Sequence, residues 1–209
     1  MDALKKHGFK IVVVLFVVAV AVYAYMELFG GKRFPVLKEA AEFSLRHVDG
    51  SEVSLANTDG KVRLIYFFFS HCPDVCPPTT QILGKVQEEL IAKKALGTKA
   101  YLMSVTIDPL RDTPERLREY SAYFDARLDG GWYFLRSETE QEVWDLAQQY
   151  SVGVRKLDNG DFIHSNIYVL VDKEGRIRHY YLIGEDVLMG DTNKLAKEIA
   201  GDMISLARK

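Results

Sequence analysis

Two short runs of apolar residues, 61–69 (KVRLIYFFF) and 100–107 (AYLMSVTI), constrain the fold of this chain more than any other feature. Continuous apolar runs of this length are typical of strands that are buried on both faces of a sheet. Each run is followed by a helical pattern that starts at a proline, at Pro77 after the first run and at Pro114 after the second. Strands that alternate with helices in this way indicate an α/β fold.

The rest of the chain supplies further elements of both kinds. The pattern predicts a hairpin at 41–55, strands at 132–135, 166–171 and 176–183, and helices at 138–150 and near the C-terminus, where Leu195, Ile199 and Met203 repeat every four residues. The hairpins imply antiparallel pairs beside the parallel strands. We therefore expect a three-layer α/β sandwich with a mixed sheet.

A third apolar segment, 11–30 (IVVVLFVVAVAVYAYMELFG), is long enough to cross a bilayer as a helix. It carries no charge before Glu27 and has no polar face, which argues against a helix packed on a globular core. A cleaved signal peptide is the alternative, because Ala19 and Ala21 have the spacing of a cleavage site. The apolar run continues past that point, so we expect an uncleaved transmembrane anchor.

Basic residues lie on both sides of the predicted anchor. The lysines before it favour a cytoplasmic N-terminus, and the basic residues after it weaken that bias. These residues are Lys5, Lys6, Lys10, Lys32, Arg33 and Lys38. We expect a cytoplasmic tail at 1–10, the anchor at 11–30, a linker at 31–39 and a folded domain at 40–209 on the exported side of the cell membrane.

The composition limits the kinds of partner. The chain has 209 residues, 48% of them hydrophobic, and a formal net charge of −2. This suits one globular domain with a short additional segment. A near-neutral chain lacks the basic surface that binds a nucleic-acid backbone, so we expect no nucleic-acid partner.

The only two cysteines, Cys72 and Cys76, lie in SHCPDVCPPTT (70–80), at the junction of a predicted strand and helix. The N–H groups and dipole of a helix N-terminus stabilise a thiolate, so at least one thiol should be more acidic than a free cysteine. Their separation permits a disulfide, which an exported domain can keep oxidised. The CxxxC spacing is not that of haem attachment, and two thiols cannot form a four-cysteine zinc site.

A metal bound by the two sulfurs would need a further ligand, for which histidine is a candidate. His71 adjoins Cys72, and His164 stands in the loop DFIHSN just before the predicted strand at 166–171. Loops at neighbouring strand ends can converge, so His164 could be a ligand or an ordinary loop histidine. Two thiolates and an imidazole favour Cu(I), with a catalytic-type zinc site as the weaker choice. The other histidines are expected outside the site: His7, His47 in a surface hairpin, and His179 in a strand.

Three motifs together resemble the Sco family: HCPDVCP (71–77), the preceding LIYFFFS (64–70) and TIDPLRDTPERL (106–117). The likeness runs from about residue 42 to the C-terminus. Sco proteins are membrane-anchored copper-binding proteins that serve the assembly of cytochrome c oxidase. The resemblance therefore implies a thioredoxin-like three-layer sandwich that binds copper.

The same resemblance assigns the copper ligands. Carried onto this chain, the family's ligands are Cys72, Cys76 and His164, which would hold Cu(I) or Cu(II). This chain has Phe68-Phe69-Ser70 where the family commonly has Gly-Phe-Thr, and Ile163 where an aspartate commonly precedes the ligand histidine. The second departure leaves His164 without an obvious carboxylate to orient it.

Several charged residues in or near the motifs are not among the implied copper ligands. Asp161 is close enough to His164 in sequence to replace the missing carboxylate. Asp108 and Arg111 belong to the resemblance, but the sequence assigns them no chemistry. For Asp112, helix capping and loop bracing is the expected role, with Thr113 as the alternative cap.

These features predict a membrane-anchored copper chaperone that delivers copper to the dinuclear copper centre of cytochrome c oxidase. Its expected partners are the copper-bearing oxidase subunit, the membrane, a copper donor and a thiol reductant. The alternative is a thiol–disulfide oxidoreductase or redox sensor that uses Cys72 and Cys76 as its redox pair. Thioredoxin-like reductases place a cis-proline opposite the thiols, but no proline follows Pro114 in this chain. We therefore favour the chaperone.

Overall fold

The computed structural model describes most of the chain, namely residues 2–29, 34–72 and 74–208, with side chains for 7–22 in the first range. Several residues used to predict the anchor and its orientation lie outside that description. They are residues 30–33 and the side chains of Lys5, Lys6, Tyr23, Tyr25 and Glu27. The orientation of the N-terminal segment therefore stays a prediction.

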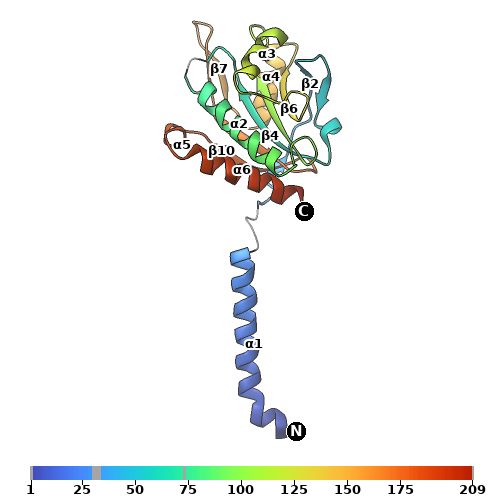
Figure 1. The fold of residues 1–209 in the computed structure, drawn as a ribbon, viewed down its shortest axis with the longest axis vertical. Coiled ribbons are helices and arrows are strands. Elements are labelled where there is room, and N and C mark those ends of the chain that lie inside the picture. The colour runs from blue at the N-terminus through green and yellow to red at the C-terminus, as the bar shows by residue number, and fades with distance from the viewer. Residues whose placement is uncertain (1, 30–33, 73, 209) are drawn as a thin grey trace. The chain divides into compact units, whose positions relative to one another are not determined.

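The chain divides into two compact units, Met1–Phe34 and Pro35–Lys209. The first contains a long helix, α1 (Asp2–Phe29), drawn in blue in Figure 1. Within the described residues, no helix is both long enough and apolar enough to cross a membrane. The transmembrane helix expected at 11–30 is therefore not supported by the structure.

The second unit is built on a mixed sheet whose strand order is β1-β10-β9-β4-β5-β6-β2-β3. Neighbouring pairs β4–β5 and β5–β6 are parallel, and the other pairs are antiparallel. The strands are β1 (Lys38–Glu39), β2 (Ser44–His47), β3 (Glu52–Ser54), β4 (Val62–Phe68), β5 (Ala100–Thr106), β6 (Trp132–Arg136), β9 (Ile167–Val171) and β10 (Arg176–Leu182). Every residue of β4 is buried, as expected of a central strand.

Helices cover both faces of this sheet. The helices are η1 (Ala56–Thr58), α2 (Cys76–Ala92), α3 (Pro114–Ala122), α4 (Glu140–Gln149), α5 (Glu185–Leu188) and α6 (Thr192–Ala207). Figure 1 shows α2 and α6 side by side, and both contact β5. Successive residues of β4 point to opposite faces: Phe68 stacks on Tyr120 of α3, whereas Phe67 contacts Tyr150 at the end of α4.

The structure therefore confirms the predicted α/β fold with a mixed sheet. Pro114 begins α3 as expected, and α2 begins at Cys76, one residue before Pro77. The hairpin expected at 41–55 is confirmed by the pairing of β2 with β3, but the expectation that His47 is exposed on it was wrong. Because β2 pairs with β6, His47 is buried and its Nδ1 accepts a hydrogen bond from the N–H of Phe134 (3.2 Å).

A small second sheet corrects the prediction of a loop around His164. The strands β7 (Val154–Lys156) and β8 (Phe162–His164) form an antiparallel hairpin in which Val154 pairs with His164. Each strand has only three residues, which is too short for a period to show in the sequence. The expected linker at 31–39 likewise contains β1, an exposed edge strand paired with β10.

The order of the strands brings three chain segments to one edge of the large sheet. Because β4 and β5 are parallel, the loops that follow them, 69–75 and 107–113, leave at the same edge. Strand β9 runs antiparallel to β4, with Tyr168 opposite Tyr66, so the hairpin that precedes β9 reaches that edge as well. The cysteines, the 107–113 loop and His164 therefore meet there.

Candidate metal centre

The loop between β4 and α2 places the two cysteines at the start of a helix. Both are free thiols, and both are buried, Cys76 completely. Cys76 is the first residue of α2, whereas Cys72 lies in the loop that precedes the helix.

The contact between the two thiols, together with burial and nearby backbone N–H groups, makes their acidities unequal. Cys72 accepts a hydrogen bond from the Cys76 thiol and others from the backbone N–H groups of Asp74, Val75 and Cys76, which together lower the pKa of Cys72 to about 6. The same hydrogen bond to Cys72, together with burial, raises the pKa of Cys76. The expectation that one thiol is unusually acidic is confirmed, and the acidic thiol is Cys72.

His164 ends strand β8 and faces the cysteines. Its Nε2 lies 3.7 Å from the Sγ of Cys76. Its Nδ1 lies 3.1 Å from the carbonyl oxygen of Ser165, and since a carbonyl only accepts, Nδ1 carries the proton. Burial lowers the pKa of His164, so the ring is neutral near pH 7. A neutral imidazole with its Nε2 lone pair toward sulfur has the form that metal coordination requires.

The Ser165 carbonyl orients the His164 ring by accepting a hydrogen bond from Nδ1, the role that a carboxylate has in the family pattern. Ile163 occupies the position of the missing aspartate, and its side chain is 51% exposed. Asp161 accepts a hydrogen bond from Asn159 (3.0 Å) and lies 3.9 Å from Arg111, so it does not replace that aspartate. A backbone carbonyl carries no signal in the sequence, so this contact could not have been predicted.

The site opens into a cavity of about 310 Å³. Its walls are formed by Phe69, Cys72, Asp74, Val75, Asp161, Phe162, Ile163 and His164. Beneath it, Tyr66 is fully buried, and its ring centroid lies 6.5 Å from that of His164. Within the described part of the chain, the Tyr66 hydroxyl has no hydrogen-bond partner. Burial, followed by the nearby sulfur of Cys76, raises the pKa of Tyr66 well above its ordinary value.

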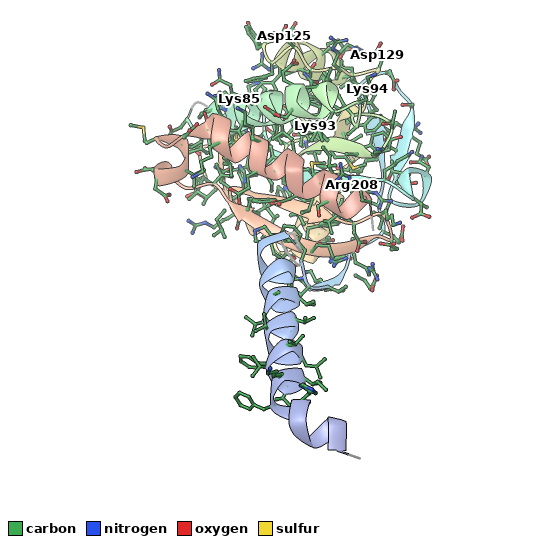
Figure 2. All side chains as sticks on the ribbon, turned by 60° about the horizontal axis from the view of Figure 1, so that its bottom comes forward. Lys85, Lys93, Lys94, Asp125, Asp129 and Arg208 are labelled. Atoms are coloured by element: carbon green, nitrogen blue, oxygen red, sulfur yellow. The ribbon has the colours of Figure 1, made fainter. Side chains whose placement is uncertain are left out.

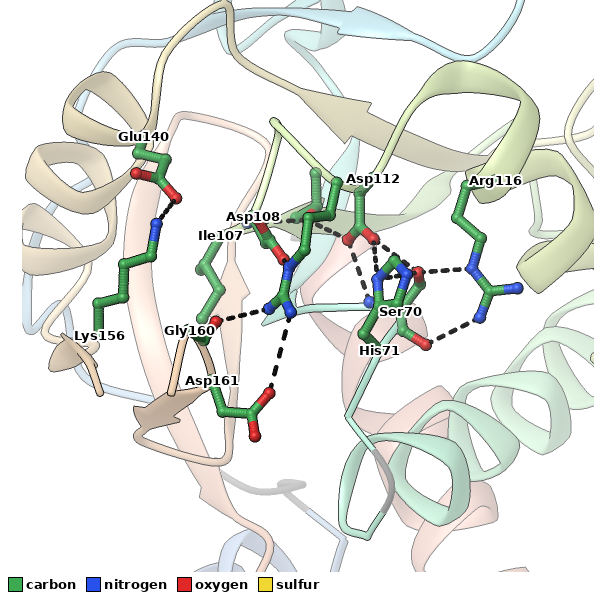
Figure 3. A network of polar contacts seen from close by, with 12 residues as sticks. Ser70, His71, Ile107, Asp108, Asp112, Arg116, Glu140, Lys156, Gly160 and Asp161 are labelled. Carbon is green, nitrogen blue, oxygen red and sulfur yellow. Dashed lines mark hydrogen bonds and ion pairs between the residues drawn. The ribbon is translucent and has the colours of Figure 1, made fainter. Parts of the chain in front are cut away.

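A second polar cluster braces the cysteine loop (Figure 3), which confirms the bracing role expected of Asp112. Asp112 is fully buried and accepts hydrogen bonds from the N–H (3.0 Å) and hydroxyl (2.5 Å) of Ser70 and from the hydroxyl of Thr106. Arg116 donates to the hydroxyl (3.0 Å) and carbonyl (3.2 Å) of Ser70. Of the two residues expected to cap α3, the structure shows that Thr113 is the cap. Its side chain accepts a hydrogen bond from the N–H of Arg116.

His71 belongs to this bracing cluster. Its Nδ1 lies 3.3 Å from a carboxylate oxygen of Asp112, and potential ligand atoms of His71, Asp108 and Asp112 all lie within 4.8 Å of one another. The carboxylates are already engaged: Asp112 by Ser70 and Thr106, and Asp108 by an ion pair with Arg111. The geometry is that of a hydrogen-bonded brace at the base of the cysteine loop.

The family model described as SCO1/SenC matches residues 35–199 of the chain. The SCO1 protein homolog of Bacillus subtilis (strain 168) is 28% identical over 164 residues, which cover 77% of this chain and 83% of the relative.

Two solved structures share the fold. BsSco, described as a member of the Sco family of cytochrome c oxidase assembly proteins with a disulfide switch, has a TM-score of 0.70 at 26% identity and covers 84% of this chain and 98% of its own. Bradyrhizobium japonicum ScoI, solved with copper bound, has a TM-score of 0.65 at 26% identity and covers 80% of this chain and 99% of its own. These likenesses confirm the expected thioredoxin-like α/β fold.

Proposed function

The chain belongs to the SCO1/SenC family, and on that premise we propose that it binds copper through Cys72, Cys76 and His164 and supplies it during assembly of cytochrome c oxidase. The observation that carries this proposal is the approach of His164 Nε2 to Cys76 Sγ at 3.7 Å. It is supported by a hydrogen bond from Nδ1 that leaves Nε2 free to coordinate.

The donor set suits copper chemically. Two sulfurs and one neutral imidazole form a soft site, and soft sulfur ligands select Cu(I). Cys72 is ionised near neutral pH, because its pKa is lowered to about 6. Cys76, whose pKa is raised, must give up its proton when the metal binds, so copper uptake is coupled to proton release. The copper is cargo that the site must also release.

The recipient we propose is the dinuclear copper centre in the copper-bearing subunit of the oxidase. Support comes from BsSco, which is described as a cytochrome c oxidase assembly protein, and from ScoI, which was solved with copper bound. A copper donor and a thiol reductant complete the proposed partners, because the thiols must be reduced before the site can accept metal.

A second candidate function, thiol–disulfide exchange, is favoured by the unequal thiols. The Cys72 thiolate would attack one sulfur of a partner disulfide, forming a mixed disulfide and releasing the partner's other sulfur as a thiolate. Cys76, after losing its proton, would attack the Cys72 sulfur and release the partner's second thiolate. The pair loses two electrons as the Cys72–Cys76 disulfide forms, and the partner gains them.

We also propose that α1 anchors the chain to the cell membrane, with the folded unit on the exported side. The side chains of α1 that support this are apolar and exposed around the helix (Figure 2), and they include Ile11, Val12, Val14, Leu15, Phe16 and Val17. Exposed apolar surface of this extent is unusual for a helix in water. The N-terminal tail at 1–10 would be cytoplasmic.

The test of the copper site compares His164→Ala with Cys72→Ser and Cys76→Ser. We expect His164→Ala to weaken copper binding by about 100-fold or more, since removal of an outer partner alone costs about 10–100-fold. Its cysteines should still form and reopen their bridge, because disulfide exchange needs no imidazole. Each serine variant should lose both properties.

A matched control is His179→Ala, which removes a histidine from β10 whose ring contacts Tyr181. It should bind copper as the parent does. If His164→Ala also binds copper like the parent and supports normal oxidase activity in cells, the three-ligand site is wrong. Thiol–disulfide exchange would then become the leading function.

A further inference from the structure

Arg111 links the two halves of the candidate copper site, and we infer that it is the positioning residue for His164. The inference rests on the proposed function, because it concerns the same copper site. The sequence placed Arg111 in a family motif without any role. The structure places it in the loop between β5 and α3, beside the hairpin that carries His164.

One guanidinium group joins this loop to the hairpin turn. Arg111 forms an ion pair with Asp108 through Nε, and its Nη2 donates a hydrogen bond to the carbonyl oxygen of Gly160 at 2.8 Å. Its Nη1 lies 3.9 Å from a carboxylate oxygen of Asp161. Figure 3 shows Asp108 on one side of this network and Gly160 and Asp161 on the other. Asp108 is 1% exposed, so the anchoring carboxylate is held rigidly.

The hairpin needs such an external contact to hold its place. The strands β7 and β8 form a two-stranded sheet separate from the large one, and a two-stranded hairpin is marginally stable alone. Phe162 packs against Phe69 and Trp144, with ring centroids 5.4 Å and 5.9 Å apart. These ring contacts and an ion pair between Lys156 and Glu140 (2.6 Å) hold the hairpin on the domain, whereas the hydrogen bond from Arg111 fixes the backbone four residues before His164.

The same loop also holds the cysteine half of the site. Asp112 binds the N–H and hydroxyl of Ser70, two residues before Cys72. Within five residues, the loop therefore contacts the cysteine segment through Asp112 and the histidine segment through Arg111. This arrangement sets the separation between the sulfurs and the imidazole before any metal arrives. An arginine suits the task, because its planar fork binds several acceptors at fixed angles and a lysine ammonium does not.

The experiment is a double-mutant cycle on the full chain, with Cu(I) as the probe and a chromogenic Cu(I) chelator as competitor. We expect Arg111→Ala to weaken Cu(I) binding by about 10-fold, the lower end of the effect of outer-sphere partners. Because Arg111 acts through His164, the Arg111→Ala/His164→Ala double variant should bind Cu(I) as weakly as His164→Ala alone. Arg111→Lys should also lose affinity, since the rotatable donors of an ammonium do not hold Asp108 and Gly160 in the fixed geometry of a guanidinium fork.

Two measurements separate positioning from general damage to the fold. The equilibrium of the Cys72–Cys76 bridge with glutathione should not change in Arg111→Ala, because the thiol–disulfide step itself requires no imidazole. The matched control is Arg118→Ala, which removes a half-exposed arginine of α3 that pairs with Glu115 at 3.6 Å. Arg118→Ala should leave both Cu(I) affinity and the disulfide equilibrium unchanged.

Either of two single variants would overturn the inference if it bound Cu(I) as tightly as the parent: Arg111→Ala or Arg111→Lys. The inference would also fail if the double variant bound Cu(I) more weakly than His164→Ala by the same factor that Arg111→Ala alone loses. Failure of the proposed function looks different, because His164→Ala would then bind Cu(I) as tightly as the parent. If His164→Ala loses affinity and Arg111→Ala does not, the copper site stands and only the role of Arg111 falls.

Discussion

Cys72 and Cys76 carry the same side chain, but their surroundings give them opposite acidities. Cys72 receives hydrogen bonds from the Cys76 thiol and from the backbone N–H groups of Asp74, Val75 and Cys76, and its pKa falls to about 6. Cys76 donates to Cys72 and is fully buried, and its pKa rises. The sulfur of Cys72 is therefore ionised near neutral pH and can react or bind a metal. Cys76 loses its proton only when its sulfur binds a metal or forms the disulfide.

The acidity of Cys72 can be tested by its rate of alkylation. A thiolate is present above its pKa, so the rate for the reduced protein should rise with pH up to about 6 and then level off. The alkylation rate of an unperturbed cysteine would continue to rise until about pH 8.5. Iodoacetamide labelling followed by mass spectrometry gives the rate at each pH. In Cys76→Ala the largest cause of the shift is removed, so the midpoint for Cys72 should move to higher pH; an unchanged midpoint would contradict the assigned cause.

The elements that the sequence predicted best are those whose burial shows in their own residues. The apolar runs became β4 and β5, and the prolines marked the start of α3 and, within one residue, of α2. The hairpin β7–β8 could not be predicted, because its three-residue strands include the charged Arg155 and Lys156 and depend on contacts from α4 and the 107–113 loop.

The candidate site shows the same division. The cysteine pair and its acidity follow from a local pattern, a strand end followed by a helix. The contact of His164 with the carbonyl of Ser165 involves a backbone group, which carries no sequence signal. The hydrogen bond from Arg111 to Gly160 joins residues that lie 49 positions apart. Such contacts depend on the tertiary fold and became visible only in the structure.

The pairing of β4 with β9 gives a prediction at the scale of elements. Tyr66 and Tyr168 face each other across these strands, with ring centroids 5.4 Å apart, and both are fully buried. The Tyr168 hydroxyl donates to the carbonyl of Thr79 at 2.6 Å, whereas the Tyr66 hydroxyl has no partner among the described residues. Removing a satisfied hydroxyl loses a hydrogen bond, and removing an unsatisfied one relieves a desolvation cost.

In urea unfolding of the reduced protein, Tyr168→Phe should therefore lower the free energy of unfolding by about 1 kcal/mol. Tyr66→Phe, the matched substitution on the neighbouring strand, should raise it by about 1 kcal/mol. A loss of stability in Tyr66→Phe equal to that in Tyr168→Phe would mean that the Tyr66 hydroxyl is hydrogen-bonded in solution.

For the whole molecule, the two units have separate tasks in the proposed function. Every residue of the candidate copper site belongs to the unit Pro35–Lys209, and the family match lies within it. The unit Met1–Phe34 contributes α1 and none of the proposed ligands. If a copper carrier is held in the same membrane as its recipient, the effective concentration of the carrier near the recipient is higher. Copper binding should therefore be independent of α1, and copper delivery should depend on it.

Removing residues 1–34 tests this division directly. The shortened chain should bind Cu(I) with the affinity of the full chain and appear in the soluble fraction of cells, while oxidase activity falls at equal expression. An unrelated transmembrane helix in place of residues 1–34 should restore activity, because the proposed role of the segment is to confine the domain and not to contact copper. A full chain that is processed near Val22 and recovered free of membranes would contradict the anchor. Full oxidase activity from the soluble fragment would show that delivery does not need confinement.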